Sequence, residues 1–223
     1  MTYGSDIGSK FNEDGSVRRY PGNTVVADIT PGCSAYDVMQ HLRQMVIDAG
    51  MADYLILLPT DSYHMTLLGG LNDAKRGDWW PHEKLPNHVS MDIADDYTTN
   101  VMHKVGLPGP QRMRFDYVRM SKSAMVVILQ TTDEAQEKLL RKFRDDAAQE
   151  LGAYRPNHDK YRFHISLAYV RVIPEGEAEV RCQNMLEQMN AYLAQQPAFE
   201  TGAPYVAYFD DMLHYSHTRI PRD

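Results

Sequence analysis

Apolar and polar residues alternate in two short segments that lie far apart in the chain. The first is residues 63–67, with the sequence YHMTL, and the second is residues 163–167, with the sequence FHISL. Side chains two residues apart share one face of a β-strand. Each segment is therefore predicted to be a strand whose histidine and hydroxyl residue face one way, while Tyr63 or Phe163 points into the core.

The hydrophobic pattern elsewhere predicts further strands and amphipathic helices. Strands are expected at residues 24–29, 54–58, 112–120, 124–130, 161–171 and 205–213. Residues 34–37 and 131–134 each have the spacing of a capping box, and apolar positions at helical spacing follow them. The apolar helix faces are expected at Val38, Leu42, Met45, Val46 and Ala49, at Ala135, Leu139, Phe143, Ala147 and Leu151, and at Cys182, Met185, Leu186, Met189 and Leu193. A further helix is expected at residues 91–104.

The order of these elements repeats at an offset of 100 residues, which is the separation of His64 and His164. Strand 24–29, helix 34–49 and the first histidine strand correspond to strand 124–130, helix 133–151 and the second histidine strand. Few side chains are identical, so the repeat is one of organisation. We expect an α+β, bilobal, duplicated fold, with two mainly antiparallel sheets that face a central groove and helices on the outer faces.

The expected segments are an N-terminal arm (residues 1–22), one domain (23–213) and a C-terminal tail (214–223). The two lobes would span about residues 23–105 and 111–213, and strands could be exchanged between them. The arm is polar and glycine-rich and is expected to be solvated. Residues 71–87 show no regular periodicity and contain Trp79 and Trp80. We expect a long loop there, whose tryptophans either close a pocket or pack on the domain.

Composition limits the class of protein. The chain has 223 residues, a formal net charge of −7, 43% hydrophobic residues and 24% charged residues, as in globular chains. The negative charge argues against binding to duplex DNA, because that affinity depends on Lys and Arg. No apolar run reaches the roughly 18–20 residues of a membrane span, and two cysteines are too few for a disulfide framework. We expect a cytoplasmic monomer that binds no membrane.

The paired histidines and hydroxyl residues indicate acid–base chemistry. His64 and His164 could act as general base and general acid, because an imidazole with a pKa of about 6.5 exists in both forms near neutral pH. Thr66 and Ser166 could donate hydrogen bonds to a phosphate oxygen. These donors and an imidazolium can carry developing charge, so no metal or other cofactor is expected. His158 could border the groove but is expected to be a solvated loop residue, and the other histidines, including the two in the tail, are expected to be structural or exposed.

The two motifs, inside a duplicated α+β frame, resemble the two-histidine (2H) phosphoesterase superfamily. That superfamily includes bacterial RNA-ligase-like 2′,3′-cyclic phosphodiesterases, cyclic-nucleotide phosphodiesterases of plants and vertebrates, and RNA-trimming exonucleases. The resemblance covers about residues 23–213, and the arm and the tryptophan loop are similar to a less characterised bacterial and fungal subgroup. It implies that His64 and His164 are the acid–base pair and that Thr66 and Ser166 bind phosphate oxygens. Ser166 replaces the commoner threonine but keeps the hydroxyl.

The resemblance implies metal-independent hydrolysis of a cyclic phosphate, either a 2′,3′-cyclic nucleotide or an RNA end. Arg162 precedes His164 by two residues, so its side chain is expected on the same strand face. There it would either add positive charge beside the phosphate or pair with an acidic neighbour. Trp79 and Lys160 are expected to contact the substrate. Two alternatives stay open, namely a non-catalytic module that binds a nucleotide or RNA end, and an RNA ligase that uses the same site.

Overall fold

A computed structural model describes residues 1–220. The strands are β1 (Gly22–Asp28), β2 (Leu55–Leu57), β3 (His64–Asn72), β4 (Arg112–Met120), β5 (Ala124–Thr131), β6 (His164–Val170), β7 (Phe199–Glu200) and β8 (Tyr205–Phe209). The α-helices are α1 (Ser34–Asp48), α2 (Met91–Val105), α3 (Glu134–Leu151) and α4 (Glu177–Leu193). Short 3-10 helices are η1 (Thr60–Ser62), η2 (Asp73–Lys75) and η3 (His158–Lys160).

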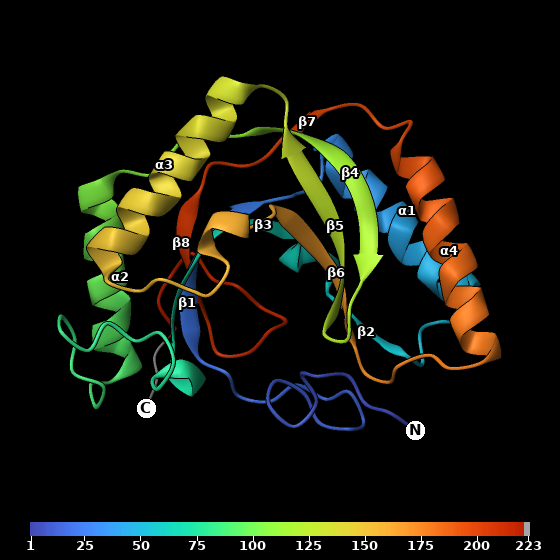
Figure 1. The fold of residues 1–223 in the computed structure, drawn as a ribbon, viewed down its shortest axis with the longest axis horizontal. Helices are drawn as coiled ribbons and strands as arrows, with labels where there is room; N and C mark the ends of the chain where they lie inside the picture. The colour runs from blue at the N-terminus through green and yellow to red at the C-terminus, as the bar shows by residue number, and fades with distance from the viewer. Residues whose placement is uncertain (221–223) are drawn as a thin grey trace.

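The strands pair in the order β7-β4-β5-β6-β3-β1-β8, and β2 pairs with β6. The register between β3 and β6 contains one residue pair, Met65 and Ile165. The two expected sheets are therefore continuous, but they meet only at the histidine strands. Figure 1 shows the strands in the centre, with α2 and α3 on one side and α1 and α4 on the other. The expected α+β fold with antiparallel strands is confirmed.

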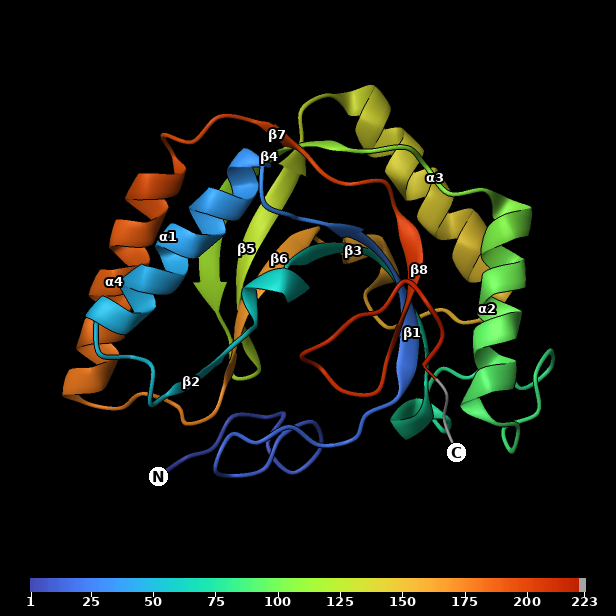
Figure 2. The same ribbon diagram turned by 180° about the vertical axis from the view of Figure 1, so that it is seen from behind.

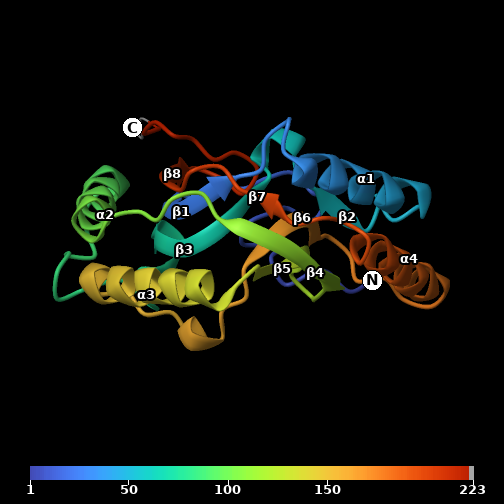
Figure 3. The ribbon, with the colours of Figure 1, turned by 90° about the horizontal axis from the view of Figure 1, so that it is seen from above.

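Each half of the chain contributes elements to the sheet of the other half. Strand β2 comes from the first half and pairs with β6, whereas β8 comes from the second half and pairs with β1. The helices follow the same exchange, because α1 packs against α4 and β6, while α3 packs against α2 and β3. These two helix pairs lie at opposite ends of the molecule in Figures 2 and 3.

Both histidine strands carry a bulge directly after the hydroxyl residue. Leu67 is skipped in the pairing of β3 with β1, and Leu167 is skipped in the pairing of β6 with β5. A bulge shifts the alternation of side chains by one position. Gly69, rather than Gly70, therefore follows Thr66 on the face of β3 that carries the histidine.

Burial confirms the predicted direction of the side chains before the bulges. Tyr63 and Phe163 are 1% and 2% exposed, and Met65 and Ile165 are fully buried. The histidine and the hydroxyl residue of each motif are only partly buried. The apolar positions thus hold each strand in the core, and the polar positions stay open on the opposite face.

The starts of two helices differ from the expectation. The N-cap of α1 is Cys33, which makes no side-chain capping bond, so Ser34 is not a cap. Helix α3 is capped by Asp133, whose carboxylate accepts a hydrogen bond from the Gln136 N–H. Thr131 is not the cap, because it is the last residue of β5. The buried face of α3 is also rotated, since Leu139 is 52% exposed.

The two terminal segments pack on the domain more closely than expected. In the N-terminal arm, Phe11 is fully buried and its ring centroid lies 4.9 Å from that of Tyr169. In the tail, Ser216 exchanges two backbone hydrogen bonds with Tyr208 of β8. Residues 221–223 of the expected tail lie outside the described residues. Within residues 1–220, no helix combines the length and apolar character that crossing a bilayer requires.

Candidate active site

Strands β3 and β6 open their polar faces onto one cavity of about 570 Å³. All of the side chains expected at the site line this cavity, and they are His64, Thr66, Trp79, Lys160, Arg162, His164 and Ser166. The two motifs, 100 residues apart in sequence, come together because β3 and β6 are neighbours. A pair of imidazoles and a pair of hydroxyls therefore face the same space.

The backbone holds both imidazoles in the same way. His64 Nδ1 lies 2.7 Å from the carbonyl oxygen of Ser62, and His164 Nδ1 lies 2.8 Å from the carbonyl oxygen of Arg162. A carbonyl oxygen only accepts, so Nδ1 carries the hydrogen in each ring. In the neutral tautomer that results, Nε2 has a lone pair. Nε2 is therefore the atom through which either histidine can take up or release a proton.

Burial lowers the pKa of both histidines. The pKa of His64 falls from 6.5 to about 4, chiefly because burial penalises the imidazolium. The hydrogen bond to Ser62 and the charge of Asp28 oppose this shift. Burial also lowers the pKa of His164, against the hydrogen bond to Arg162. Burial thus favours the neutral form of both rings, and a bound anion would favour protonation.

Neighbouring charges distinguish the two histidines. Asp28 is the β1 partner of His64 in the strand register, whereas the apolar Ile128 is the β5 partner of His164. The Asp28 carboxylate raises the pKa of His64, and the Arg119 guanidinium lowers the pKa of His164. The duplicated frame is therefore electrostatically asymmetric.

Tyr215, from the expected C-terminal tail, covers the first histidine. Its ring centroid lies 4.2 Å from that of His64 and 5.2 Å from that of Phe209. The tail histidine His217 also has partners, because its Nε2 lies 3.1 Å from a carboxylate oxygen of Asp28. A peripheral tail was expected here, because no periodic pattern in the sequence marks a segment that folds back.

The lining of the cavity is basic although the whole chain is acidic. Its cationic side chains are Lys10, Lys75, Arg119, Arg144, Arg155, Lys160 and Arg162. Among the described residues that line it, none is an aspartate or a glutamate. Such a lining attracts anions and is suited to phosphate. Arg162 donates a hydrogen bond to the Tyr117 hydroxyl at 3.1 Å, a neutral partner instead of the acidic neighbour considered above.

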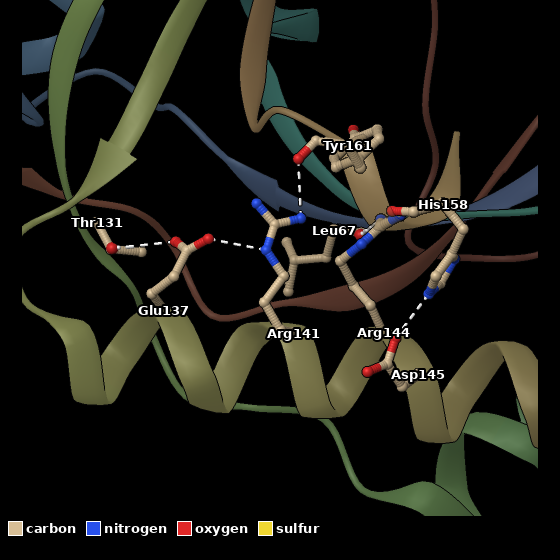
Figure 4. A network of polar contacts seen from close by, with 8 residues as sticks. All are labelled: Leu67, Thr131, Glu137, Arg141, Arg144, Asp145, His158 and Tyr161. Atoms are coloured by element: carbon tan, nitrogen blue, oxygen red, sulfur yellow. Dashed lines mark hydrogen bonds and ion pairs between the residues drawn. The ribbon is translucent and has the colours of Figure 1, made fainter. Parts of the chain in front are cut away.

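Two arginines in this lining, the buried Arg144 and the half-buried Arg155, were not anticipated. Arg144 is 3% exposed and donates to the backbone carbonyls of Leu67 and His158 (Figure 4). Its guanidinium carbon lies 3.9 Å from the ring centroid of Tyr161. Arg155 donates to the carbonyl of Gly70 at 2.9 Å. A signal for Arg144 exists in the sequence, since it interrupts the apolar face of α3.

The two tryptophans of the 71–87 loop have different environments. Trp80 is 5% exposed, and its Nε1–H donates to the carbonyl of Leu85 at 3.0 Å. Trp79 lines the cavity, and cationic atoms of Lys75 and Arg155 lie 5.3 and 5.4 Å from its ring centroid. One tryptophan thus anchors the loop, and the other reaches the site.

The described residues contain one group of potential metal ligands, formed by Asp145, His158 and Asp159, whose ligand atoms lie within 4.8 Å of one another. Both carboxylates are exposed, and His158 Nε2 lies 2.9 Å from Asp145 Oδ1. That hydrogen bond, drawn in Figure 4, accounts for the orientation of the imidazole. His158 is buried, so it is not the solvated loop residue expected from the sequence.

Comparisons with known proteins identify the family. A family model described as "2H-phosphodiest: Domain of unknown function (DUF1868)" matches residues 10–126, which include the first histidine motif. The crystal structure of ATU0111, a conserved protein of unknown function from Agrobacterium tumefaciens str. C58, is 29% identical with a TM-score of 0.85, over 96% of this chain and 91% of that chain. E. coli LigT complexed with 3′-AMP is 13% identical with a TM-score of 0.48, over 88% of this chain and 94% of that chain.

No curated protein matches the sequence. Since the family model matches more than half of the chain, the protein belongs to the 2H phosphodiesterase family that is described as a domain of unknown function.

Proposed function

We propose that this protein is a metal-independent phosphodiesterase that hydrolyses a cyclic phosphate, either a 2′,3′-cyclic nucleotide or an RNA end. One observation carries the proposal. Two His-x-hydroxyl motifs, with both imidazoles held through Nδ1 by the backbone, converge on one cavity whose charged lining is entirely Lys and Arg among the described residues. Donors for phosphate oxygens and groups for proton transfer are thus combined in one space.

The reaction needs two proton transfers at opposite sides of the phosphorus atom. One neutral imidazole removes a proton from water through Nε2, and the water oxygen forms a bond to phosphorus. The bond from phosphorus to one ribose oxygen breaks, and the other histidine, as imidazolium, protonates that oxygen through Nε2. Thr66 and Ser166 donate hydrogen bonds to the non-bridging oxygens, whose charge the surrounding cations stabilise.

The donor set of the cavity supports the metal-independent part of the proposal. Hard divalent cations prefer carboxylate oxygens as protein ligands, and the described lining offers none. The hydroxyls, the imidazolium and the guanidinium groups supply the positive field in their place. Activity should therefore survive a chelator.

Burial is the largest cause for both pKa values and lowers that of His64 to about 4, so the bound phosphate anion must raise the pKa of whichever histidine is the acid. Among the smaller causes, the neighbouring charges favour His64 as the acid and His164 as the base. Asp28 stabilises a proton on His64, and Arg119 disfavours one on His164. A substrate with a p-nitrophenyl leaving group tests the assignment, because p-nitrophenolate departs without protonation. His64→Ala should then lose less activity with a p-nitrophenyl phosphodiester than with a cyclic phosphate, and His164→Ala should lose as much with both. The opposite pattern would reverse the roles.

The central experiment measures opening of a panel of 2′,3′-cyclic nucleotides in the presence of EDTA. His64→Ala and His164→Ala should each reduce kcat/KM by at least about 10²-fold, as is typical for a general acid or base. His88→Ala is the matched control, because His88 is exposed and does not line the cavity. Equal activity of the wild type and both cavity variants, or complete inhibition by EDTA, would contradict the proposal.

A further inference from the structure

The cavity extends beyond the histidine pair along β3 toward a second cluster of donors. Tyr161 donates its hydroxyl hydrogen to the carbonyl of Thr66 at 2.9 Å, Arg144 donates to the carbonyl of Leu67, and Arg155 donates to that of Gly70. The β1 partners of Thr66 and Gly69 are Val26 and Thr24, which are two residues apart, so Gly69 lies about 7 Å from Thr66 along the strand at roughly 3.3 Å per residue. Arg155 is therefore too far along β3 to share the phosphate that the two hydroxyls bind.

Several donors in this cluster have no partner. The Nε atoms of Arg144 and Arg155 and the Nε1 atom of Trp79 are buried, and none of them makes a hydrogen bond. All three are N–H groups, and all three side chains line the cavity. Buried donors are normally satisfied, because an unpaired one destabilises the folded state. Three such donors beside one cavity indicate a site built for acceptors.

The charge of the cluster is also uncompensated. Within residues 1–220, neither Arg144 nor Arg155 forms an ion pair with a carboxylate, although Arg144 is buried and Arg155 is half-buried. Lys10 and Lys75, at the edge of the same cavity, pair with Asp6 and Asp78 at 3.1 Å. The two lysines therefore do not need a ligand for charge balance, whereas the two arginines do.

The guanidinium groups are held in place before any ligand binds. Arg155 lies against a residue without a side chain, because a Cβ at Gly69 would be 2.4 Å from its Cζ. The guanidinium group of Arg155 also lies beside the Trp79 ring, with Cζ 5.4 Å from the ring centroid. The guanidinium group of Arg144 lies over the Tyr161 ring, with Cζ 3.9 Å from its centroid. Fixed guanidinium groups recognise phosphate with little loss of side-chain entropy.

We propose that Arg155, Trp79 and Arg144 form a second phosphate subsite, distinct from the position between the two histidines. Resting on the proposed function, this inference narrows the substrate to molecules that carry a second phosphate one nucleoside away from the cyclic one. Either a terminal 5′-phosphate or the next phosphodiester of an RNA end supplies that chemistry. A cyclic nucleotide without a second phosphate would be a poorer substrate.

The test compares kcat/KM for adenosine 2′,3′-cyclic phosphate with that for the same compound bearing a 5′-phosphate. Wild type should prefer the 5′-phosphorylated substrate by at least 10-fold. The ratio should fall at least 5-fold in Arg155→Gln and in Trp79→Phe. The second variant keeps an aromatic side chain but removes the unpaired N–H. Lys142→Gln is the control for lost charge, since Lys142 is exposed on α3 and pairs with Asp146. A ratio near one in wild type, or an unchanged ratio in both cavity variants, would overturn the subsite.

A binding measurement separates this inference from the proposed function. Calorimetry with adenosine 3′-phosphate and adenosine 3′,5′-bisphosphate requires no turnover. Tighter binding of the bisphosphate, lost in Trp79→Phe, would support the subsite even if no cyclic phosphate were opened. Equal affinities would contradict it even if the enzyme were active. A dinucleotide that ends in a cyclic phosphate then distinguishes the two sources, because a preference for it over the 5′-phosphorylated mononucleotide identifies an RNA end.

Discussion

The contact between Tyr215 and His64 leads to a prediction about the pKa of the histidine. Burial is the main reason that this pKa falls from 6.5 to about 4, and the Tyr215 ring, 4.2 Å away, is part of the covering layer. Tyr215→Ala opens this side of the imidazole to water. We expect the pKa of His64 to rise by at least about one pH unit, because hydration stabilises the imidazolium.

The size of the effect follows from the two end points. The gap between 6.5 and about 4 corresponds to at most roughly 3.4 kcal/mol, at 1.36 kcal/mol per pH unit. The folded chain binds this proton less readily than the unfolded chain does. The free energy of unfolding of wild type should therefore fall as the pH drops from about 6.5 to about 4, and this fall should be smaller in Tyr215→Ala.

The measurement is an NMR titration of the His64 ring, assigned by comparison with His64→Gln. Tyr215→Phe is the matched control, because it retains the aromatic cover. A pKa of His64 near 4 in Tyr215→Ala, or near 6.5 already in wild type, would refute the idea that the C-terminal segment desolvates this histidine.

Three further predictions test other parts of the molecule. Gly69→Ala should displace the Arg155 guanidinium, since the new Cβ would lie 2.4 Å from its Cζ, and should lower the preference for a second phosphate at least 5-fold. Gly77→Ala, whose Cβ meets nothing within 4 Å, should leave that preference unchanged. Met65→Ala should reduce the free energy of unfolding by about 2–5 kcal/mol, measured in urea, because Met65 is fully buried. Asp28→Asn should lower the pKa of His64 further in an NMR titration, since the Asp28 carboxylate raises it; a rise would contradict the electrostatic asymmetry.

The sequence was sufficient to locate the histidine pair because strand periodicity is local information. Alternation in each motif placed His64 and Thr66 on one face, and the repeated order of elements predicted that the second motif would face the same space. The burial pattern and the shared cavity agree with both steps. Loop lengths and helix caps were harder to predict from the sequence. Helix α3 shows this, because its cap is Asp133, whereas the capping-box spacing began at residue 131.

The rest of the cavity could not be predicted because it depends on chain segments that meet only in three dimensions. Arg155 comes from an irregular loop, Lys10 from the N-terminal arm and Tyr215 from the C-terminal segment. None has a local pattern that reveals its direction. Arg144 is the exception, because a charged residue on an apolar helix face requires partners, and the backbone carbonyls that it meets were not visible in the sequence.

The exchange of β2 and β8 between the halves of the molecule has a consequence for how the protein is made. During synthesis, β1 and β3 emerge early, but the outer partner of β1 is β8, at residues 205–209. The first lobe therefore stays incomplete, with an unpaired strand edge, until residues 205–209 have left the ribosome. Contacts over such sequence separations slow folding, and an unpaired edge can associate with other chains. Expressing either half alone should yield aggregation-prone material, whereas the two halves together could reassemble.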